Sequence, residues 1–168
     1  IYNKNMRNII FKGFYLFVLT MSCWLPTAVQ AQLFDPAAYY EIVSSNGLVL
    51  DNQDSEVEGT KIFLNNRIPG RISQVWIIKN MWGITYQLIT PLSEKSIDCD
   101  SLLTEGAVIQ KNSSGLEQQC WWIKPPRNNT CTITNRISKM NLCYPDARLP
   151  GEPVFQLKAD SSLENQVW

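Results

Sequence analysis

The sequence predicts an all-β fold made of three four-stranded repeats with pseudo-threefold symmetry. The first observation is a triplet, Gln-x-Trp, that occurs at residues 74–76, 119–121 and 166–168, so that its copies lie 45 and 47 residues apart. A near-constant period of this length indicates a repeated supersecondary unit. The second observation is that short apolar runs alternate with turn residues, and no segment has a sustained helical period.

Four further landmarks recur with the same period. Each unit opens with a strand-like run and reaches an apolar residue with a polar residue or a cysteine after it. A glycine follows eight residues later, and an aliphatic residue stands three positions beyond that glycine. The runs are 40–43, 86–89 and 131–134, the pairs are Leu50-Asp51, Ile97-Asp98 and Leu142-Cys143, the glycines are Gly59, Gly106 and Gly151, and the aliphatic residues are Ile62, Ile109 and Val154.

The first unit gives the four strands in order. The run 40–43 is followed by Asn46-Gly47, a hairpin-turn signal, and then by a second strand over 48–50. A polar loop leads to a third strand around 62–64, and a second loop precedes a fourth strand over 74–78. Three copies of this pattern give twelve strands. The predicted repeats cover about 39–79, 85–124 and 130–168, the last of them with its final strand truncated.

A domain of strands with a threefold period must close or cover its sheet edges. The arrangement that does so is the β-trefoil, in which six strands form a short barrel and six form three hairpins that cap one end. The order Tyr-x-Ile, Asn-Gly, Leu-Asp, Gly-x-x-Ile and Gln-x-Trp resembles the ricin B-type lectin β-trefoil family. This resemblance covers residues 39–168.

The resemblance implies a set of carbohydrate-binding residues. In that family an aspartate at the position of Asp51 and Asp98 accepts hydrogen bonds from sugar hydroxyls, and a carboxylate offers two oxygens for this. The family also has an aromatic platform six residues after the glycine and a polar residue just before Gln-x-Trp. Asn65 and Asn112 stand at the platform positions here, and Gln118 precedes the second triplet. The second unit is therefore the first candidate site, and the first unit comes next.

Several departures from the family pattern support another interpretation. None of the three platform positions is aromatic, since the third is Leu157, and the third unit has Cys143 in place of the aspartate. Aspartate is also a common turn-capping residue, which would explain the other two units without a ligand. A platform from another direction would have to come from Trp82, Trp122 or Tyr144, for which packing under a loop is the favoured role.

The repeated tryptophans predict the centre of the fold. Large aromatic side chains repeated by threefold symmetry are expected to meet near the axis and to dominate core burial. The glutamine of each triplet is expected to satisfy backbone groups of an adjoining loop. The predicted core residues are Trp76, Trp121, Trp168, Ile62, Ile109, Val154, Leu50, Ile97 and Leu142.

Residues 1–31 have the composition of a secretory signal peptide. Three basic residues precede a short apolar run, and a small-residue stretch ends at Ala31, after which we expect cleavage. Met6 is the expected start, and 32–38 is a leader into the domain. A lipoprotein signal that uses Cys23 is the alternative. We expect a secreted or periplasmic protein.

The cysteine count fits an exported chain. Cys99, Cys120, Cys131 and Cys143 remain after the expected cleavage, and four cysteines permit three disulfide pairings. The repeat register favours 99–120 with 131–143, because each pair then lies within one unit. Metal binding by these four residues is a weaker alternative, because no Cys-x-x-Cys pair occurs.

Charge and composition exclude several function classes. The chain has 15 basic and 15 acidic residues, and removal of the predicted leader takes away three basic ones, which leaves 12 − 15 = −3. No block of Lys or Arg remains, so we expect no nucleic-acid partner. No histidine is present, and the sequence predicts no cofactor and no metal. The apolar run of the leader is too short for a comfortable membrane span, and we expect none in the mature chain.

The leading hypothesis is a secreted carbohydrate-binding module with a glycan or polysaccharide as its partner and no catalytic activity of its own. The alternative is a degenerate β-trefoil that serves as a structural or protein-interaction module. Hydrolysis by paired carboxylates is not expected, because Asp51 and Asp98 belong to different units. The third unit stops at Trp168, where the other two continue as strand, so we expect a longer native chain with room for a downstream catalytic domain.

Overall fold

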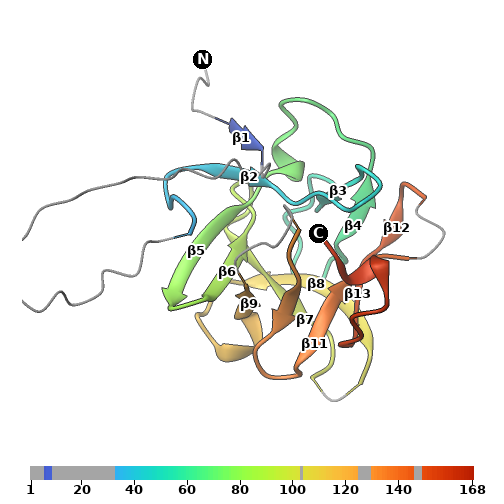
Figure 1. Ribbon diagram of the computed structural model, residues 1–168. Helices are drawn as coiled ribbons and strands as arrows, with labels where there is room; N and C mark the ends of the chain where they lie inside the picture. The colour runs from blue at the N-terminus through green and yellow to red at the C-terminus, as the bar shows by residue number, and fades with distance from the viewer. Residues whose placement is uncertain (1–5, 9–32, 103, 125–129, 146–148) are drawn as a thin grey trace, which may run out of the picture.

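The computed structural model describes residues 6–8, 33–102, 104–124, 130–145 and 149–168 (Figure 1). Its regular structure is almost entirely strand, which confirms the all-β prediction. The predicted signal peptide, residues 1–31, and its cleavage site lie outside the described residues, apart from β1 (Met6–Asn8), which pairs in parallel with β2 (Tyr39–Glu41). The strands are β1 (Met6–Asn8), β2 (Tyr39–Glu41), β3 (Val49–Asp51), β4 (Phe63–Asn65), β5 (Ile77–Trp82), β6 (Thr85–Ile89), β7 (Lys95–Cys99), β8 (Gly106–Asn112), β9 (Trp121–Ile123), β10 (Ile133–Asn135), β11 (Met140–Cys143), β12 (Glu152–Pro153) and β13 (Phe155–Lys158). Three short 3₁₀ turns are η1 (Ile72–Gln74), η2 (Glu117–Gln119) and η3 (Glu164–Gln166).

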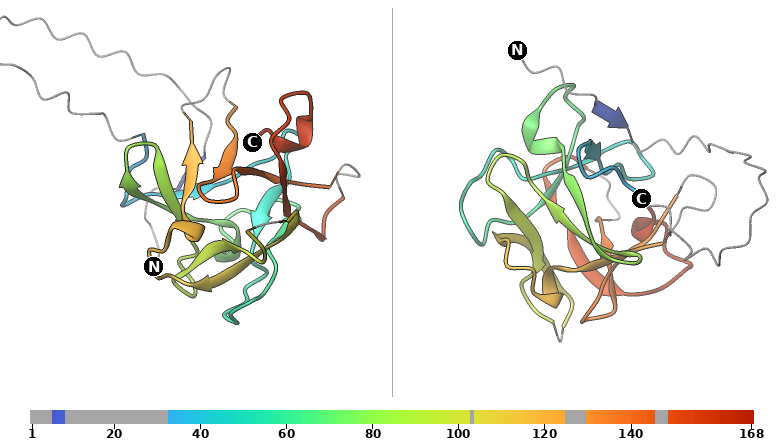
Figure 2. Two further views of the ribbon diagram at one scale, coloured as in Figure 1. Left: turned by 90° about the horizontal axis from the view of Figure 1, so that it is seen from below. Right: turned by 90° about the vertical axis from the view of Figure 1, so that its left-hand side faces the viewer.

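Seven strands close into a ring. Their order is β6, β7, β8, β13, β11, β10 and β9, and the ring closes because β9 pairs with both β10 and β6. β5 joins the ring as the hairpin partner of β6, and β3, β4 and β12 form a smaller sheet. Figures 1 and 2 show these short strands wrapped around a common interior and joined by long loops. Closure leaves few free strand edges, which an all-β chain otherwise has to protect.

Three backbone hydrogen bonds form a closed triangle on the pseudo-threefold axis. The amide of Ile62 donates to the carbonyl of Val108 (2.9 Å), the amide of Val108 to Val154 (3.2 Å), and the amide of Val154 back to Ile62 (2.8 Å). Successive members of the triangle are 46 residues apart in the sequence, the third bond closes the ring back to Ile62, and all three side chains are fully buried. The three units are therefore equivalent at their centre, and the predicted β-trefoil is confirmed.

This triangle corrects the predicted alignment of the second unit. Ile109 was expected to match Ile62 and Val154, but its neighbour Val108 occupies that position. Side chains alternate along a strand, so Val108 enters the core and Ile109 lies on the other side of β8. Ile109 is buried at 6% exposure, as predicted, although it lies outside the central cluster.

The physical reason is that the loop from β7 to β8 is one residue shorter than its two counterparts. Gly59 and Gly151 occupy equivalent loop positions with φ of +83° and +87°, whereas Gly106 has no positive φ and already belongs to β8. The platform position moves with the loop. In the first unit Asn65 pairs with Val49 across the strands. The counterpart of Val49 in the second unit is Ser96, and it pairs with Lys111, not with Asn112.

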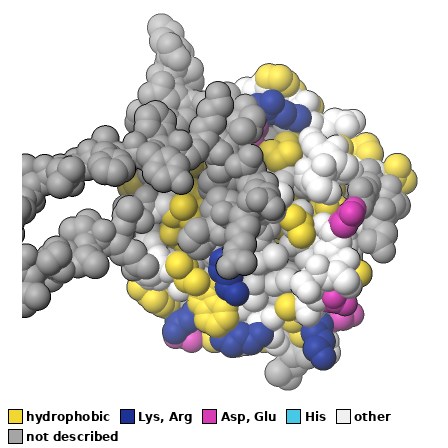
Figure 3. Space-filling view, in the orientation of Figure 1, with side chains coloured by type: hydrophobic (Ala, Val, Ile, Leu, Met, Phe, Trp, Pro, Cys, Tyr) yellow, Lys and Arg dark blue, Asp and Glu magenta, His cyan; other side chains and the backbone are white. Residues whose placement is uncertain are grey.

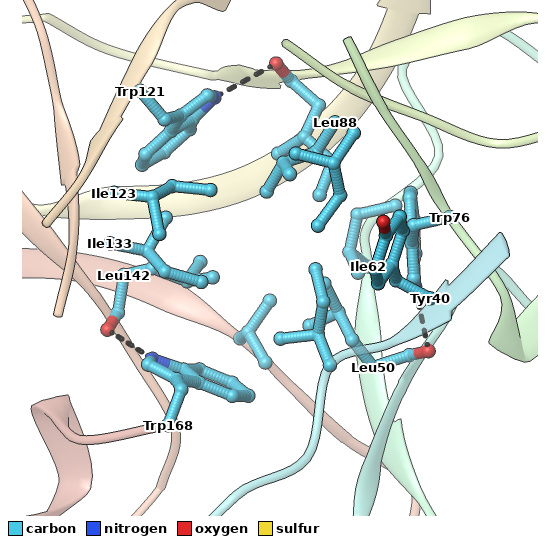
Figure 4. Close-up of a cluster of buried hydrophobic side chains, with 14 of the residues drawn as sticks. Tyr40, Leu50, Ile62, Trp76, Leu88, Trp121, Ile123, Ile133, Leu142 and Trp168 are labelled. Atoms are coloured by element: carbon cyan, nitrogen blue, oxygen red, sulfur yellow. Dashed lines mark hydrogen bonds between the residues drawn. The ribbon is translucent and has the colours of Figure 1, made fainter. Parts of the chain in front are cut away.

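Trp76, Trp121 and Trp168 occupy equivalent positions in one buried cluster (Figure 4). Each indole N–H donates to the carbonyl of the apolar residue that precedes the aspartate or cysteine position, at 3.1, 3.3 and 2.9 Å; these acceptors are Leu50, Ile97 and Leu142. Figure 4 shows the indoles around a group of aliphatic side chains. The core prediction is confirmed, but the indoles surround the axis instead of meeting on it, because Ile62 and its two equivalents are there.

The glutamine of each triplet ends a 3₁₀ turn, and does not begin the fourth strand as predicted. The turn directs the side chain back towards the loop after the third strand. Gln74 shows the pattern: its Nε2 donates to the carbonyl of Asn66 (2.8 Å) and its Oε1 accepts from the amide of Ile68 (2.7 Å). Gln119 and Gln166 make the same pair of bonds in their units. The predicted role of this glutamine is confirmed.

None of the four cysteines of the domain forms a disulfide, so the predicted 99–120 and 131–143 bridges are not formed. The Cys99 thiol donates to the side-chain oxygen of Gln156 in the third unit, at 3.1 Å. The Cys120 thiol faces the carbonyl of Leu116 within its own turn, at 3.5 Å. Membership of one unit therefore does not bring these two sulfur atoms together, because each is directed at a different partner.

Candidate functional site

Asp51 is the last residue of β3, and its side chain is almost fully buried at 1% exposure. Its Oδ1 accepts from the amide of Gln53 (2.6 Å), and its Oδ2 accepts from Asn65 Nδ2 and Gln74 Nε2 (both 3.0 Å). A buried carboxylate requires such donors, because its removal from water is costly. The predicted residues Asp51 and Asn65 are thus brought together. Gln74 joins them, a contact that the sequence reasoning missed.

These side chains line a pocket of about 460 Å³. Ile68 and Pro150 give the pocket an apolar side, and Ile68 is 46% exposed. Pro150 belongs to the third unit, which reaches the first through the pairing of β12 with β4. No local sequence signal could have linked Pro150 to Asp51, because the two residues are 99 positions apart.

The loop after Asp51 has an unusual backbone. Gln53 and Asp54 have φ of +56° and +57°, a left-handed conformation that residues other than glycine rarely adopt. The amide of Gln53 is held by Asp51, and Asp54 forms an ion pair with Arg71 at 2.7 Å. Arg71 also lines the pocket. Backbone strain of this kind is concentrated at functional sites, so the loop draws attention to the same pocket.

Asp98 is the equivalent residue of β7, but its carboxylate is used differently. Its Oδ2 accepts from Gln119 Nε2 (3.2 Å), as in the first unit, whereas its Oδ1 accepts from the amide of the next residue, Cys99 (2.7 Å). β7 and β8 remain paired as far as Cys99 and Val108, so Asp98 lies inside the ladder and not at its end. One oxygen of this aspartate is therefore occupied within its own strand.

The other predicted residues of the second unit do not join Asp98. Asn112 Nδ2 donates to Glu58 Oε2 (3.0 Å) in the first unit. Gln118 is half-buried, and its backbone carbonyl accepts from Asn135 Nδ2 (2.8 Å). The predicted residues of the first unit therefore contact one another, whereas those of the second unit bond to other partners.

The third unit has no carboxylate at the corresponding position. Cys143 stands there, and Leu157 is the counterpart of Asn65. Gln166 Oε1 instead accepts from Asn141 Nδ2 at 2.7 Å. Tyr144, which sequence reasoning considered as a platform, is fully buried and packs edge-on against Trp168 with ring centres 5.2 Å apart.

Two further properties concern only the described part of the chain. In it, no group of three or more Cys, Asp or Glu side chains is arranged to hold a metal ion. A search of the same residues finds no helix with the length and apolar character needed to cross a membrane.

No family model and no curated protein matches this chain. Solved structures do match it. A designed threefold-symmetric protein, ThreeFoil, has a TM-score of 0.72 and 25% identity over 77% of this chain and 95% of its own. A lectin of Polyporus squamosus, solved with the epitope Neu5Aca2-6Galb1-4GlcNAc, has a TM-score of 0.68 and 17% identity, with 77% of this chain and 47% of the lectin covered. An exo-beta-1,3-galactanase of Clostridium thermocellum has a TM-score of 0.70 and 23% identity, with 77% and 29% covered.

These likenesses establish the fold. The chain has a β-trefoil fold that is also found in lectins. It spans less than half of the length of the Polyporus lectin and of the galactanase.

Proposed function

We propose that this protein is an exported, lectin-like carbohydrate-binding module with no catalytic step of its own, and that the pocket of the first unit holds the glycan. The single observation that carries the proposal is the buried Asp51 carboxylate, which is fixed by Asn65 and Gln74 at the base of a pocket of about 460 Å³. Export is supported by the composition of residues 1–31.

The chemistry of the pocket suits a sugar. An ionised carboxylate has about four acceptor positions, and three protein donors use three of them, so a ligand hydroxyl can donate to the fourth. Asn65 donates its side-chain N–H to Asp51, and its side-chain carbonyl oxygen is a second acceptor for a ligand. Ile68 and Pro150 supply apolar contact for the C–H face of a ring in place of the missing aromatic platform.

A single shallow pocket is expected to bind weakly, since a millimolar dissociation constant corresponds to only about −4 kcal/mol. Useful avidity then requires further copies or a linked domain. The galactanase, of which this chain spans 29%, supports a role as an appendage of a larger secreted enzyme.

The test compares two matched variants on a glycan array and by titration. Asp51→Asn removes the charge of the proposed ligand-binding carboxylate, and Asp98→Asn makes the same change in the second unit. We expect Asp51→Asn to weaken glycan binding at least about tenfold, or about 1.4 kcal/mol, and Asp98→Asn to leave it unchanged.

Three outcomes contradict the proposal. Equal losses in both variants would remove the assignment to the first unit. If the wild-type protein binds none of a diverse set of glycans, the alternative is favoured, a degenerate β-trefoil that binds another protein. Lys111 and Leu157, which stand at two platform positions, support that alternative. Release of sugar from a bound glycan would contradict the absence of catalysis.

A further inference from the structure

Two tryptophans lie on one outward-facing row of the barrel, away from the pocket of the first unit. Trp82 pairs with Thr85, Thr85 with Trp122, and Trp122 with Thr134, so the row crosses β5, β6, β9 and β10. Side chains alternate along a strand, and Trp121 points into the core, so Trp122 points outward. Two strand spacings, or about 10 Å, separate the backbone of Trp82 from that of Trp122.

A cation lies over each of these indoles. The guanidinium carbon of Arg136 is 4.7 Å from the ring centre of Trp82, and Lys139 Nζ is 4.0 Å from that of Trp122. Lys139 Nζ also donates to the backbone carbonyl of Arg136 at 2.5 Å, which holds the ammonium within the turn between β10 and β11, and the Arg136 guanidinium is held by its ion pair with Glu117. Figure 3 shows basic side chains gathered beside hydrophobic ones along the lower edge of the molecule, around β9.

The row is not required by the threefold repeat. The counterpart of Trp122 in the first unit is Ile77, which follows Trp76 as Trp122 follows Trp121. The counterpart of Lys139 is Gly47 in the first hairpin turn and Glu94 in the second, all with positive φ. Trp82 remains 44% exposed. A fold that builds its core without these side chains has no structural need for them, so a binding role explains them better.

The charge of the row selects among ligands. Arg136 forms an ion pair with Glu117 at 2.6 Å, so Arg136 and Lys139 together exceed the nearby acidic charge by one. Lys139 also lines a hollow of about 720 Å³, together with Lys158 and Glu105. A small surplus of positive charge suits a ligand with sparse anionic groups. A nucleic acid carries a phosphate on every residue, and binding normally neutralises several of them at once.

The size of the row also decides against a protein partner. A stable protein interface covers about 800 Å² on each partner around an apolar centre. The large apolar side chains exposed here are those of Trp82 and Ile137, at 44% and 40%. A narrow row of aromatic rings and cations matches an extended chain of sugars, whose apolar faces pack on indoles.

We propose that Trp82, Trp122, Arg136 and Lys139 form a second glycan-binding surface, which takes an acidic oligosaccharide. A sugar ring packs against the exposed part of the Trp82 indole, carboxylate or sulfate groups pair with Arg136 and Lys139, and Trp122 holds the Lys139 ammonium in place. The hollow beside Lys139 receives the next sugars of the chain. This surface acts independently of Asp51.

The test is calorimetric titration of the full chain with two acidic probes, a chondroitin sulfate hexasaccharide and a hexagalacturonate, and with their desulfated or carboxyl-reduced forms. We expect at least one acidic probe to bind about tenfold more tightly than its neutral form, and its affinity to fall as salt rises from about 0.05 M to about 0.3 M. Trp82→Ala and Lys139→Asn should each weaken that binding about fivefold. Asparagine tolerates the left-handed backbone at residue 139, so this variant should fold.

Two matched variants serve as controls. Lys79→Gln removes an exposed cation of β5 outside the row, and Asp51→Asn alters the pocket of the first unit; both should bind the acidic probe as the wild type does. The proposal is overturned if neither acidic probe binds, if neutral forms bind equally well, or if Asp51→Asn abolishes the binding. Tighter binding of a single-stranded RNA of similar length would also overturn it, in favour of a nucleic-acid surface.

Discussion

The first and second units contain the same aspartate and the same glutamine at equivalent positions, yet they present them differently. Asp51 lies at the end of its strand and lines a pocket with Asn65. Asp98 lies within a longer strand pairing, and one of its oxygens accepts from the amide of the next residue, Cys99. The second unit has Lys111 at the position that Asn65 occupies in the first. A difference of one residue in the length of a loop separates the two outcomes. Two repeats can therefore share the same aspartate and glutamine and still place them in different surroundings.

The largest expected effect concerns the glutamines. Gln74→Ala and Gln119→Ala each remove the partners of buried loop groups and one of the donors to an aspartate, so each should lower the free energy of unfolding by about 2–4 kcal/mol. Only Gln74→Ala should also abolish glycan binding, because only its aspartate faces the proposed pocket. Chemical denaturation and titration measure the two effects. Binding lost to the same degree in both variants would break the comparison.

Alkaline pH should act through the second and third units, which contain the four thiols of the domain. Burial, with a smaller contribution from the Asp98 carboxylate, raises the pKa of Cys99 to about 12, and burial raises the pKa of Cys131 to about 11. A raised folded-state pKa means that the stability is complete below the unfolded value of about 8.5 and is lost as pH rises towards the folded value. At pH 10 we expect a loss of about 1–2 kcal/mol for each thiol.

Serine variants of the two cysteines check this origin. Denaturation at pH 7 and pH 10 should show a smaller pH-dependent loss in Cys99→Ser and Cys131→Ser than in the wild type. An unchanged dependence in both variants would assign the effect to other groups. Thiol-reactive reagents should label both cysteines in the unfolded chain faster than in the folded one.

The loop lengths can be tested with glycine variants. Gly59 has φ of +83°, so Gly59→Ala should cost about 1 kcal/mol of stability, since alanine avoids this conformation. Gly106 has an ordinary backbone, and an added Cβ would meet its nearest atoms at 3.8 Å, which is normal contact. Gly106→Ala should therefore change stability by less than about 0.5 kcal/mol. Equal losses in thermal unfolding would contradict the altered register of the second unit.

The smallest effect on stability, below about 1 kcal/mol, is expected for an exchange at the platform position. Asn65→Lys gives the first unit the residue of the second, and Lys111→Asn makes the reverse exchange. We expect the first variant to lose glycan binding, because it removes an acceptor from the pocket, while the reverse variant gains no second site. A gain of binding in Lys111→Asn would show that this one residue, and not the length of the loop, separates the two units.

The fold could be predicted from the sequence alone, because the threefold pattern of tryptophan, glutamine and aliphatic residues is dictated by burial, which every copy must satisfy. The burial of the three tryptophans and the hydrogen bonds between each glutamine and its loop could be predicted in the same way. The spacing of landmarks could not reveal the shorter loop of the second unit, since Gly106 and Ile109 imitate the expected pattern one residue away from it.

Which aspartate faces a pocket depends on the packing of the whole domain and could not be predicted from local patterns. That outcome depends on Pro150, which arrives from another unit, and on how far each strand ladder continues past its aspartate. The same packing also decides that the cysteines of the domain form no disulfide and that Trp82 and Trp122 stand in one row beneath two cations. Local patterns encode burial and turns, whereas a site is formed by side chains from distant segments, and their meeting is set by packing across the whole domain.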